Sequence, residues 1–144
     1  MATNRDVLGE RRSTPQQPDP VVRTGAKALV TTEAGVLLVK ERHADGTPFW
    51  TLPGGGSRPD ERLGETLRRE LREELDCAVR VDDPVTTFWY AHTSRENALS
   101  VHTVISAGLL SRPEPVRSEG ILECRWVDPA APPAATLPQV RYLL

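Results

Sequence analysis

The sequence lacks the features that mark membrane, secreted and nucleic-acid-binding proteins. No apolar run approaches the twenty or so residues that a membrane-spanning helix needs, and the start MATNRDVLGERR lacks the apolar core of a signal peptide. The net charge is -2, so no broad basic surface favours nucleic acid. These absences predict a cytoplasmic protein without a membrane or nucleic-acid partner.

Side chains of the thiol and imidazole type are also scarce. Cys77 and Cys124 form neither a short-spaced metal-binding pair nor a disulfide framework, and both stand among apolar residues. We therefore expect small buried hydrophobic groups there rather than redox groups. His43, His92 and His102 are isolated and lack zinc-ligand spacing, so we expect surface or hydrogen-bonded structural roles for them.

The chain is long enough for one domain with a real core, because it has 144 residues. Residues 1–20 are polar, rich in proline and without periodicity, which predicts a flexible tail before a domain over residues 21–144. Asp82-Asp83-Pro84 is expected to break a strand, and the glycines after Pro53 are expected to form a turn. The expected strands cover residues 26–32, 36–42, 49–52, 78–81, 85–92, 99–110 and 121–127, and a short closing helix covers 137–144.

The segment that follows the glycine turn is predicted to be a helix with unusual charges. Leucine recurs every fourth residue from Leu63 to Leu75, which marks one stripe of a helix turning about 100° per residue. Three glutamates overlap or border this stripe, namely Glu70, Glu73 and Glu74, whereas Glu61, Glu65, Arg68 and Arg72 fall on the solvent side. A carboxylate partly removed from water needs a cation, hydrogen bonds or a shifted pKa. Mg²⁺ meets that need, because it prefers carboxylate oxygens.

An exposed helix with ordinary Arg–Glu pairs is the alternative, since such pairs at three- and four-residue spacing are common. The glycine turn and the spacing to Glu61 disfavour it. The segment resembles the Nudix hydrolase signature: glycine, five residues, Glu, seven residues, Arg-Glu, an aliphatic residue, any residue, Glu-Glu, any residue, glycine, an aliphatic residue. Here Gly55 begins the motif and Arg69 opens its second half. Asp76 and Cys77 replace the final glycine and aliphatic residue, a departure that we expect to affect only the helix-ending turn.

The resemblance implies a fold and a site. The fold is an α/β class, a Nudix-type α/β/α sandwich with a mixed β-sheet in a single domain. The implied metal ligands are Glu70, Glu73 and Glu74, completed by the backbone carbonyl of Gly54, and the implied cofactor is Mg²⁺, with Mn²⁺ as the substitute. The resemblance also implies that Arg69 and Glu61 brace the loop and the helix by pairing with each other. The two side chains can meet only if the chain that enters the helix curls toward Arg69. Whether Glu61 also contacts water or metal stays open.

Outside the motif the candidates each have a competing role. Arg42 matches a position that contacts substrate phosphates in relatives, but it is also typical of an exposed strand end. Glu119 is favoured over Glu123 as a further metal ligand or general base, although a base must reach the attacking water. Aromatic side chains able to stack on a nucleobase are more typical of core positions; they are Phe49, Trp50, Phe88, Trp89 and Tyr90.

The function implied by the resemblance is Mg²⁺-dependent hydrolysis of the phosphoanhydride of a nucleoside diphosphate linked to another moiety. Nucleoside triphosphates, ADP-ribose and nucleotide sugars all remain open as small-molecule substrates. The alternatives are a non-catalytic nucleotide sensor and a hydrolase of a non-nucleotide diphosphate, such as an isoprenoid diphosphate. Many relatives are dimers, so a homodimer is a further expectation.

Overall fold

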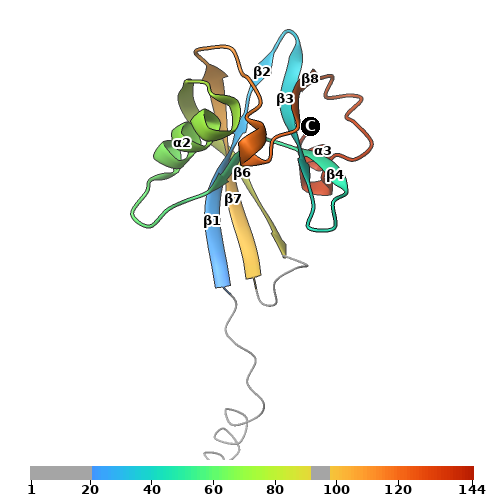
Figure 1. The fold of residues 1–144 in the computed structure, drawn as a ribbon. Helices are drawn as coiled ribbons and strands as arrows, with labels where there is room; N and C mark the ends of the chain where they lie inside the picture. Colours follow the sequence, from blue (N-terminus) through green and yellow to red (C-terminus); the bar gives the residue numbers. More distant parts are fainter. Residues whose placement is uncertain (1–20, 92–97) are drawn as a thin grey trace, which may run out of the picture.

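The computed structural model describes residues 21–91 and 98–144, so the predicted N-terminal tail and His92 lie outside the described residues. Two sheets and two α-helices make up this part. The helix α2 (Leu63–Leu75) lies on one side of the strands and α3 (Pro138–Leu143) on the other (Figure 1). A short 3₁₀ helix, η1 (Arg117–Glu119), lies beside α2. The arrangement confirms the predicted α/β class.

The first sheet is mixed, as predicted. Its strand order is β5-β1-β7-β6, in which β1 runs parallel to β7 and the other neighbouring pairs are antiparallel. Buried and half-buried residues alternate along most of β7, because successive side chains of a strand point to opposite faces. The bounds are Val21–Leu29 for β1, Gly54–Gly56 for β5, Val79–Ala91 for β6 and Ala98–Leu109 for β7.

The second sheet is antiparallel and is built around β3, which pairs with three strands. The apolar run from Val36 to Val39 is buried throughout, as a central strand covered on both faces requires. The bounds are Thr31–Thr32 for β2, Gly35–Arg42 for β3, Pro48–Thr51 for β4 and Glu123–Val127 for β8.

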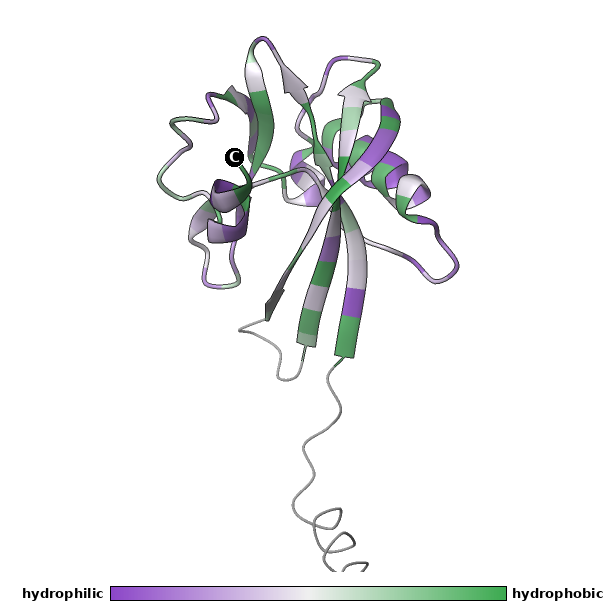
Figure 2. Cartoon of the chain, turned by 180° about the vertical axis from the view of Figure 1, so that it is seen from behind, coloured by the Kyte–Doolittle hydropathy of each residue, from purple (hydrophilic) through white to green (hydrophobic). Residues whose placement is uncertain are grey.

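Each helix covers its own apolar cluster. Leu67, Leu71 and Leu75 of α2 are fully buried against the first sheet, and each contributes about 1.5–3 kcal/mol by its burial. Leu63, the first residue of the predicted stripe, is 36% exposed, so the buried stripe begins one turn later. The second cluster gathers strands of both sheets around Val140 of α3. Figure 2 shows hydrophobic and hydrophilic residues interspersed along α2 and along the strands.

Several predicted strand bounds are wrong. The first strand begins at Val21 and ends at Leu29, while β2 is a separate short strand. The strand β8 begins at Glu123 and not at residue 121. The expected break at residues 82–84 is absent, because β6 continues through Pro84, which pairs with Ile105 between two register shifts. A proline fits there because β6 is the last strand of its sheet and its bulges absorb the missing N–H.

The expected glycine turn is instead the strand β5. Its glycines pair with β1, and Lys27 lies opposite Gly54. Gly54 has a φ of 137°, and a Cβ there would collide with the carbonyl oxygen of Ala26. Only glycine allows these two backbones to approach so closely. The consequence for the site is that α2 faces bare backbone at β5.

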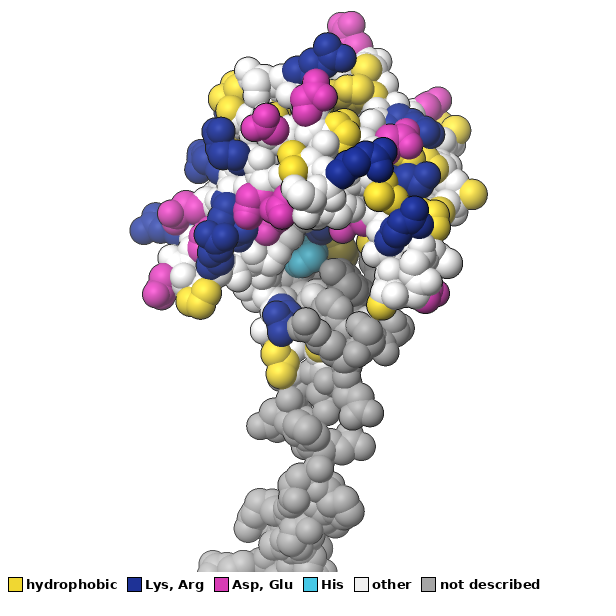
Figure 3. Space-filling model, in the orientation of Figure 1, with side chains coloured by type: hydrophobic (Ala, Val, Ile, Leu, Met, Phe, Trp, Pro, Cys, Tyr) yellow, Lys and Arg dark blue, Asp and Glu magenta, His cyan; other side chains and the backbone are white. Residues whose placement is uncertain are grey.

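On the face drawn in Figure 3, acidic and basic side chains are interspersed. Among the described residues, no helix is long and apolar enough to cross a membrane.

Candidate active site

The position of α2 is fixed at both of its ends. At the start, the N–H of Arg62 donates to the carboxylate of Glu65 at 3.1 Å, which satisfies a group that the helix leaves unpaired. At the end, Asp76 adopts the left-handed conformation with a φ of 47°, and its N–H donates to the carbonyl of Arg72. The cap expected where the signature has glycine is therefore present with aspartate.

Arg69 joins the loop before α2 to the carboxylates of the helix. Its guanidinium donates to both oxygens of Glu61, at 2.8 and 2.9 Å, and to the carbonyl of Gly56 at 2.8 Å. It also donates to Glu70 at 2.9 Å and to Glu73 at 2.8 Å. These contacts, above all that with Glu61, raise the pKa of Arg69. Such a planar fork holds three acidic side chains in fixed positions.

The predicted solvent-side position of Glu61 is wrong. Glu61 precedes the first helical residue, so the chain curls and its side chain is only 13% exposed. Its carboxylate also accepts hydrogen bonds from the N–H of Arg58 and the hydroxyl of Thr66, both at 2.9 Å. The hydrogen bonds from Arg69, followed by that from Arg58, lower the pKa of Glu61 from 4.5 to about 2.

Thr66 is a supporting residue that sequence reasoning missed. It is fully buried, and its hydroxyl shares a 2.7 Å hydrogen bond with Ser57 besides the one to Glu61. The signal available in the sequence was a hydroxyl at a buried helix position, where a polar group needs partners. Thr66 therefore ties the loop before the helix to its first turn.

Glu74 lies in a different environment, although it belongs to the same segment. It is 8% exposed and accepts one hydrogen bond from a described residue, 3.0 Å long, from the N–H of Gly54. Burial raises the pKa of Glu74 from 4.5 to about 8, opposed by the charge of Lys27 and supported by that of Glu41. A buried carboxylate with so few donors is poorly stabilised in its charged form.

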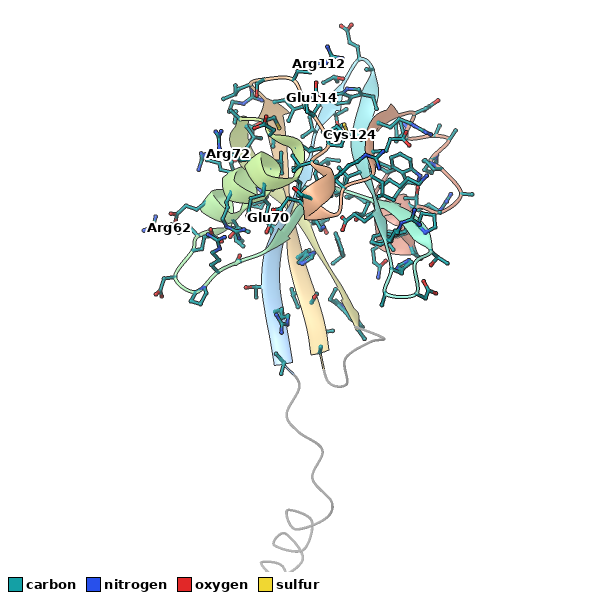
Figure 4. The ribbon with its side chains drawn as sticks, in the orientation of Figure 1. Arg62, Glu70, Arg72, Arg112, Glu114 and Cys124 are labelled. Atoms are coloured by element: carbon teal, nitrogen blue, oxygen red, sulfur yellow. The ribbon has the colours of Figure 1, made fainter. Side chains whose placement is uncertain are left out.

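Glu70 and Glu73 lie between these extremes. A Cβ on Gly55 would come within 2.7 Å of the Glu70 carboxylate, so this side chain lies directly over β5. Figure 4 shows Glu70 on the side of α2 toward the strands, whereas Arg72 lies on the outer side. Burial raises the pKa of Glu70. Glu73 is 31% exposed and, besides Arg69, has Arg58 at 3.8 Å.

Lys27 is the second residue that sequence reasoning missed. It is 7% exposed, and its ammonium donates to the carbonyl of Gly54 at 3.0 Å. The resemblance assigns this carbonyl to a metal, but in the structure it accepts the hydrogen bond from the Lys27 ammonium. The available signal was a single lysine within the apolar stretch AKALV.

The chemistry of Glu70 and Glu74 fits a hard divalent cation. Both carboxylates are largely removed from water, both have raised pKa values, and both border the bare backbone of β5. Among the described residues, no three acidic, histidine or cysteine side chains converge closely enough to form a metal site by themselves. Arg69 donates to both Glu70 and Glu73, but Glu73 is 31% exposed and also faces Arg58, whereas the side chain of Glu70 is 16% exposed and Glu74 is buried. Glu70 and Glu74 are therefore the residues best placed to hold a cation, and the metal role expected for Glu73 stays a prediction.

The candidates outside the motif are divided. Arg42 donates to the carbonyl of Gly46 at 2.8 Å within its own loop, and its contact with substrate phosphates stays a prediction. Glu123 pairs with Arg125 at 2.7 Å on the surface. Glu119 is exposed in η1, a segment fixed to the end of α2 because the N–H of Val116 donates to the carbonyl of Glu74 at 2.8 Å. Glu119 therefore belongs to a segment that is attached to the end of α2.

The aromatic candidates are mostly structural. Trp50 is 4% exposed in the second apolar cluster, with the guanidinium of Arg125 over its ring at 4.7 Å. Phe49 stacks on His43 at 4.1 Å between ring centroids. Phe88 packs against the second cluster, whereas Trp89 is 64% exposed. The side chain of Tyr90 is not among the described ones.

The chain is similar to proteins of one known family. The family model of the NUDIX domain matches residues 21–143. The nucleoside triphosphatase NudI of Escherichia coli O1:K1 is 29% identical over 117 residues, which cover 74% of this chain and 82% of that protein. A MutT NUDIX hydrolase from Burkholderia pseudomallei superposes with a TM-score of 0.73 at 22% identity, covering 84% of this chain and 94% of that one. An ADP-ribose pyrophosphatase from Streptococcus suis superposes with a TM-score of 0.63 at 21% identity, covering 84% and 87%. The two structural likenesses show the shared fold.

Proposed function

The chain belongs to the NUDIX family of hydrolases, which act on pyrophosphate bonds, and from this membership we propose that it is a Mg²⁺-dependent nucleotide pyrophosphohydrolase. Its substrate is a nucleoside diphosphate linked to a further group. Nucleoside triphosphates are the class to test first, because the relative NudI is named as a nucleoside triphosphatase. ADP-ribose and nucleotide sugars are the next classes.

The environment of Glu74 is the observation that supports this proposal most. A carboxylate that is 8% exposed, with a pKa raised to about 8, is costly to keep ionised unless a cation binds it. It lies against β5, where glycines leave the backbone open to a close ligand. A structural carboxylate would have acquired more donors, as Glu61 has.

The residues then divide into three roles. Glu70 and Glu74 would hold the cation, which when bound offsets the charge of the diphosphate and lowers the pKa of a coordinated water. Arg69 fixes Glu70 and Glu73 in place while its bidentate contact with Glu61 holds the preceding loop. Glu119 is the proposed general base, supported by the attachment of η1 to the end of α2.

The test is turnover of a nucleotide panel by the wild-type protein and by Glu74→Gln. With Mg²⁺ present, we expect the wild type to hydrolyse at least one anhydride and the variant to lose about a hundredfold or more of that rate. Glu65→Gln is the matched control, because Glu65 is an exposed helix carboxylate that only caps the first turn. Tight nucleotide binding without turnover across the panel would contradict the proposal and support a nucleotide sensor.

A further inference from the structure

A buried lysine occupies the backbone carbonyl that the resemblance assigns to the cation of the candidate active site. Lys27 stands between Ala26 and Ala28 on β1, and the side chains of these two alanines pack under α2. Because successive side chains of a strand point to opposite faces, the side chain of Lys27 points to the other face of the sheet. From that face its ammonium reaches the carbonyl of Gly54 across the edge of the sheet. The site is therefore bordered by carboxylates on one face and by a fixed positive charge on the other.

The charge of Lys27 acts on the same carboxylates that would hold the metal. Lys27 donates to the carbonyl of Gly54 at 3.0 Å and Glu74 accepts from the N–H of the same residue at 3.0 Å, so both side chains contact one glycine. The positive charge of Lys27 also lowers the pKa values of Glu70 and Glu74, against the effect of their burial. A buried ammonium is itself costly unless acceptors and negative charge surround it. The carbonyl of Gly54 is such an acceptor, and the two glutamates supply the negative charge.

A divalent cation at Glu70 and Glu74 would change this balance. It would place a second positive charge beside the ammonium, and like charges in a poorly hydrated site repel strongly. The carbonyl of Gly54 is also engaged by Lys27 at 3.0 Å and would have to be released before a metal could use it. A diphosphate group removes the conflict, because its negative charge compensates both cations.

We propose that Lys27 is a positioning residue that weakens metal binding to the free protein and so couples metal binding to substrate binding. This inference rests on the proposed function, since it takes Glu70 and Glu74 as the metal ligands. By linkage, whatever factor the nucleotide adds to metal affinity, the metal adds to nucleotide affinity. Removal of the positive charge should therefore strengthen metal binding and weaken the coupling together.

The experiment measures Mn²⁺ binding by titration calorimetry and electron paramagnetic resonance, first with Mn²⁺ alone and then with a non-hydrolysable nucleoside triphosphate analogue. Lys27→Met removes the charge and the donor, Lys27→Gln removes only the charge, and Lys27→Arg keeps both. Lys40→Met is the matched control, because it makes the same change in net charge at a lysine that lies 5.8 Å from the ring centroid of Trp50. Unfolding midpoints of all variants show that each one is folded.

We expect Lys27→Gln and Lys27→Met to bind Mn²⁺ alone at least about tenfold more tightly than the wild type, with little further gain from the nucleotide. Lys27→Arg and Lys40→Met should behave as the wild type does. Unchanged or weaker Mn²⁺ binding in both neutral variants would overturn the inference, as would an equal gain in Lys40→Met. A different result would contradict the proposed function. If Mn²⁺ binding depends on Lys27 as expected but the wild type hydrolyses no nucleotide, the hydrolase proposal is wrong and the inference about Lys27 stands.

Discussion

The entry to α2 and its last turns carry carboxylates of opposite character. At the entry, Glu61 accepts hydrogen bonds from a guanidinium, a backbone N–H and a hydroxyl, and its pKa falls to about 2. In the last turns, Glu74 accepts one hydrogen bond from a described residue, and its pKa rises to about 8. The contrast teaches that the burial of a glutamate says little until its donors are counted. Fully paired carboxylates support a fold, whereas under-paired ones mark a binding site.

Removal of the Arg69 guanidinium should have the largest effect, because it takes away the group that pairs the carboxylate at the entry to α2. In Arg69→Met, Glu61 loses both of its charged hydrogen bonds, and Glu70 and Glu73 lose their shared cation. We expect a marked fall in the urea midpoint of unfolding, because three carboxylates would lose the one guanidinium that joins them. The control Arg68→Met changes an exposed neighbour and should stay within about 0.5 kcal/mol of the wild type. Equal midpoints for the two variants would show that the Arg69 network contributes nothing.

The two glutamates should also give opposite dependences of stability on pH in the metal-free protein. The folded-state pKa of Glu61 is lowered from 4.5 to about 2, so its contribution is complete above pH 4.5 and is lost as the pH falls toward 2. The pKa of Glu74 is raised from 4.5 to about 8, so its ionisation destabilises the fold as the pH rises through that interval.

Urea unfolding across pH measures both effects by comparison with glutamine variants. The stability gap between the wild type and Glu61→Gln should close on acidification. The free energy of unfolding of Glu74→Gln should increase relative to that of the wild type as the pH rises toward 8. Parallel curves for the two variants would contradict the difference between the two ends of the segment.

The helix and its inward carboxylates could be predicted, because leucine spacing is a local signal that survives folding. The position of Glu61 could not be read from the same wheel, because the helix begins at Leu63 and the wheel does not apply to the turn before it. Lys27 was missed for another reason: its partner Gly54 is 27 residues away, and no local pattern pairs them. Pro84 misled in the opposite direction, since tertiary pairing in β6 overrode a strong local breaker.

The end of α2 offers the smallest test. Asp76 holds a left-handed conformation that costs an L-residue more than glycine, although aspartate tolerates it better than most. Asp76→Gly should raise the free energy of unfolding by about 0.5–1 kcal/mol and leave the rate of nucleotide hydrolysis unchanged. A loss of stability would mean that the aspartate side chain has a role of its own in the turn.

In this account Glu61 supports the entry to α2, and Glu74 in its last turns binds the metal. The stabilisation that Mn²⁺ gives to three proteins tests this assignment most directly. A ligand that binds only the folded state stabilises it by an amount that grows with the logarithm of the ligand concentration divided by its dissociation constant. The account predicts that Mn²⁺ raises the midpoints of the wild type and Glu61→Gln by similar amounts, although the variant starts lower, and leaves that of Glu74→Gln unchanged. An equal rise in Glu74→Gln, or its loss in Glu61→Gln alone, would contradict the assignment.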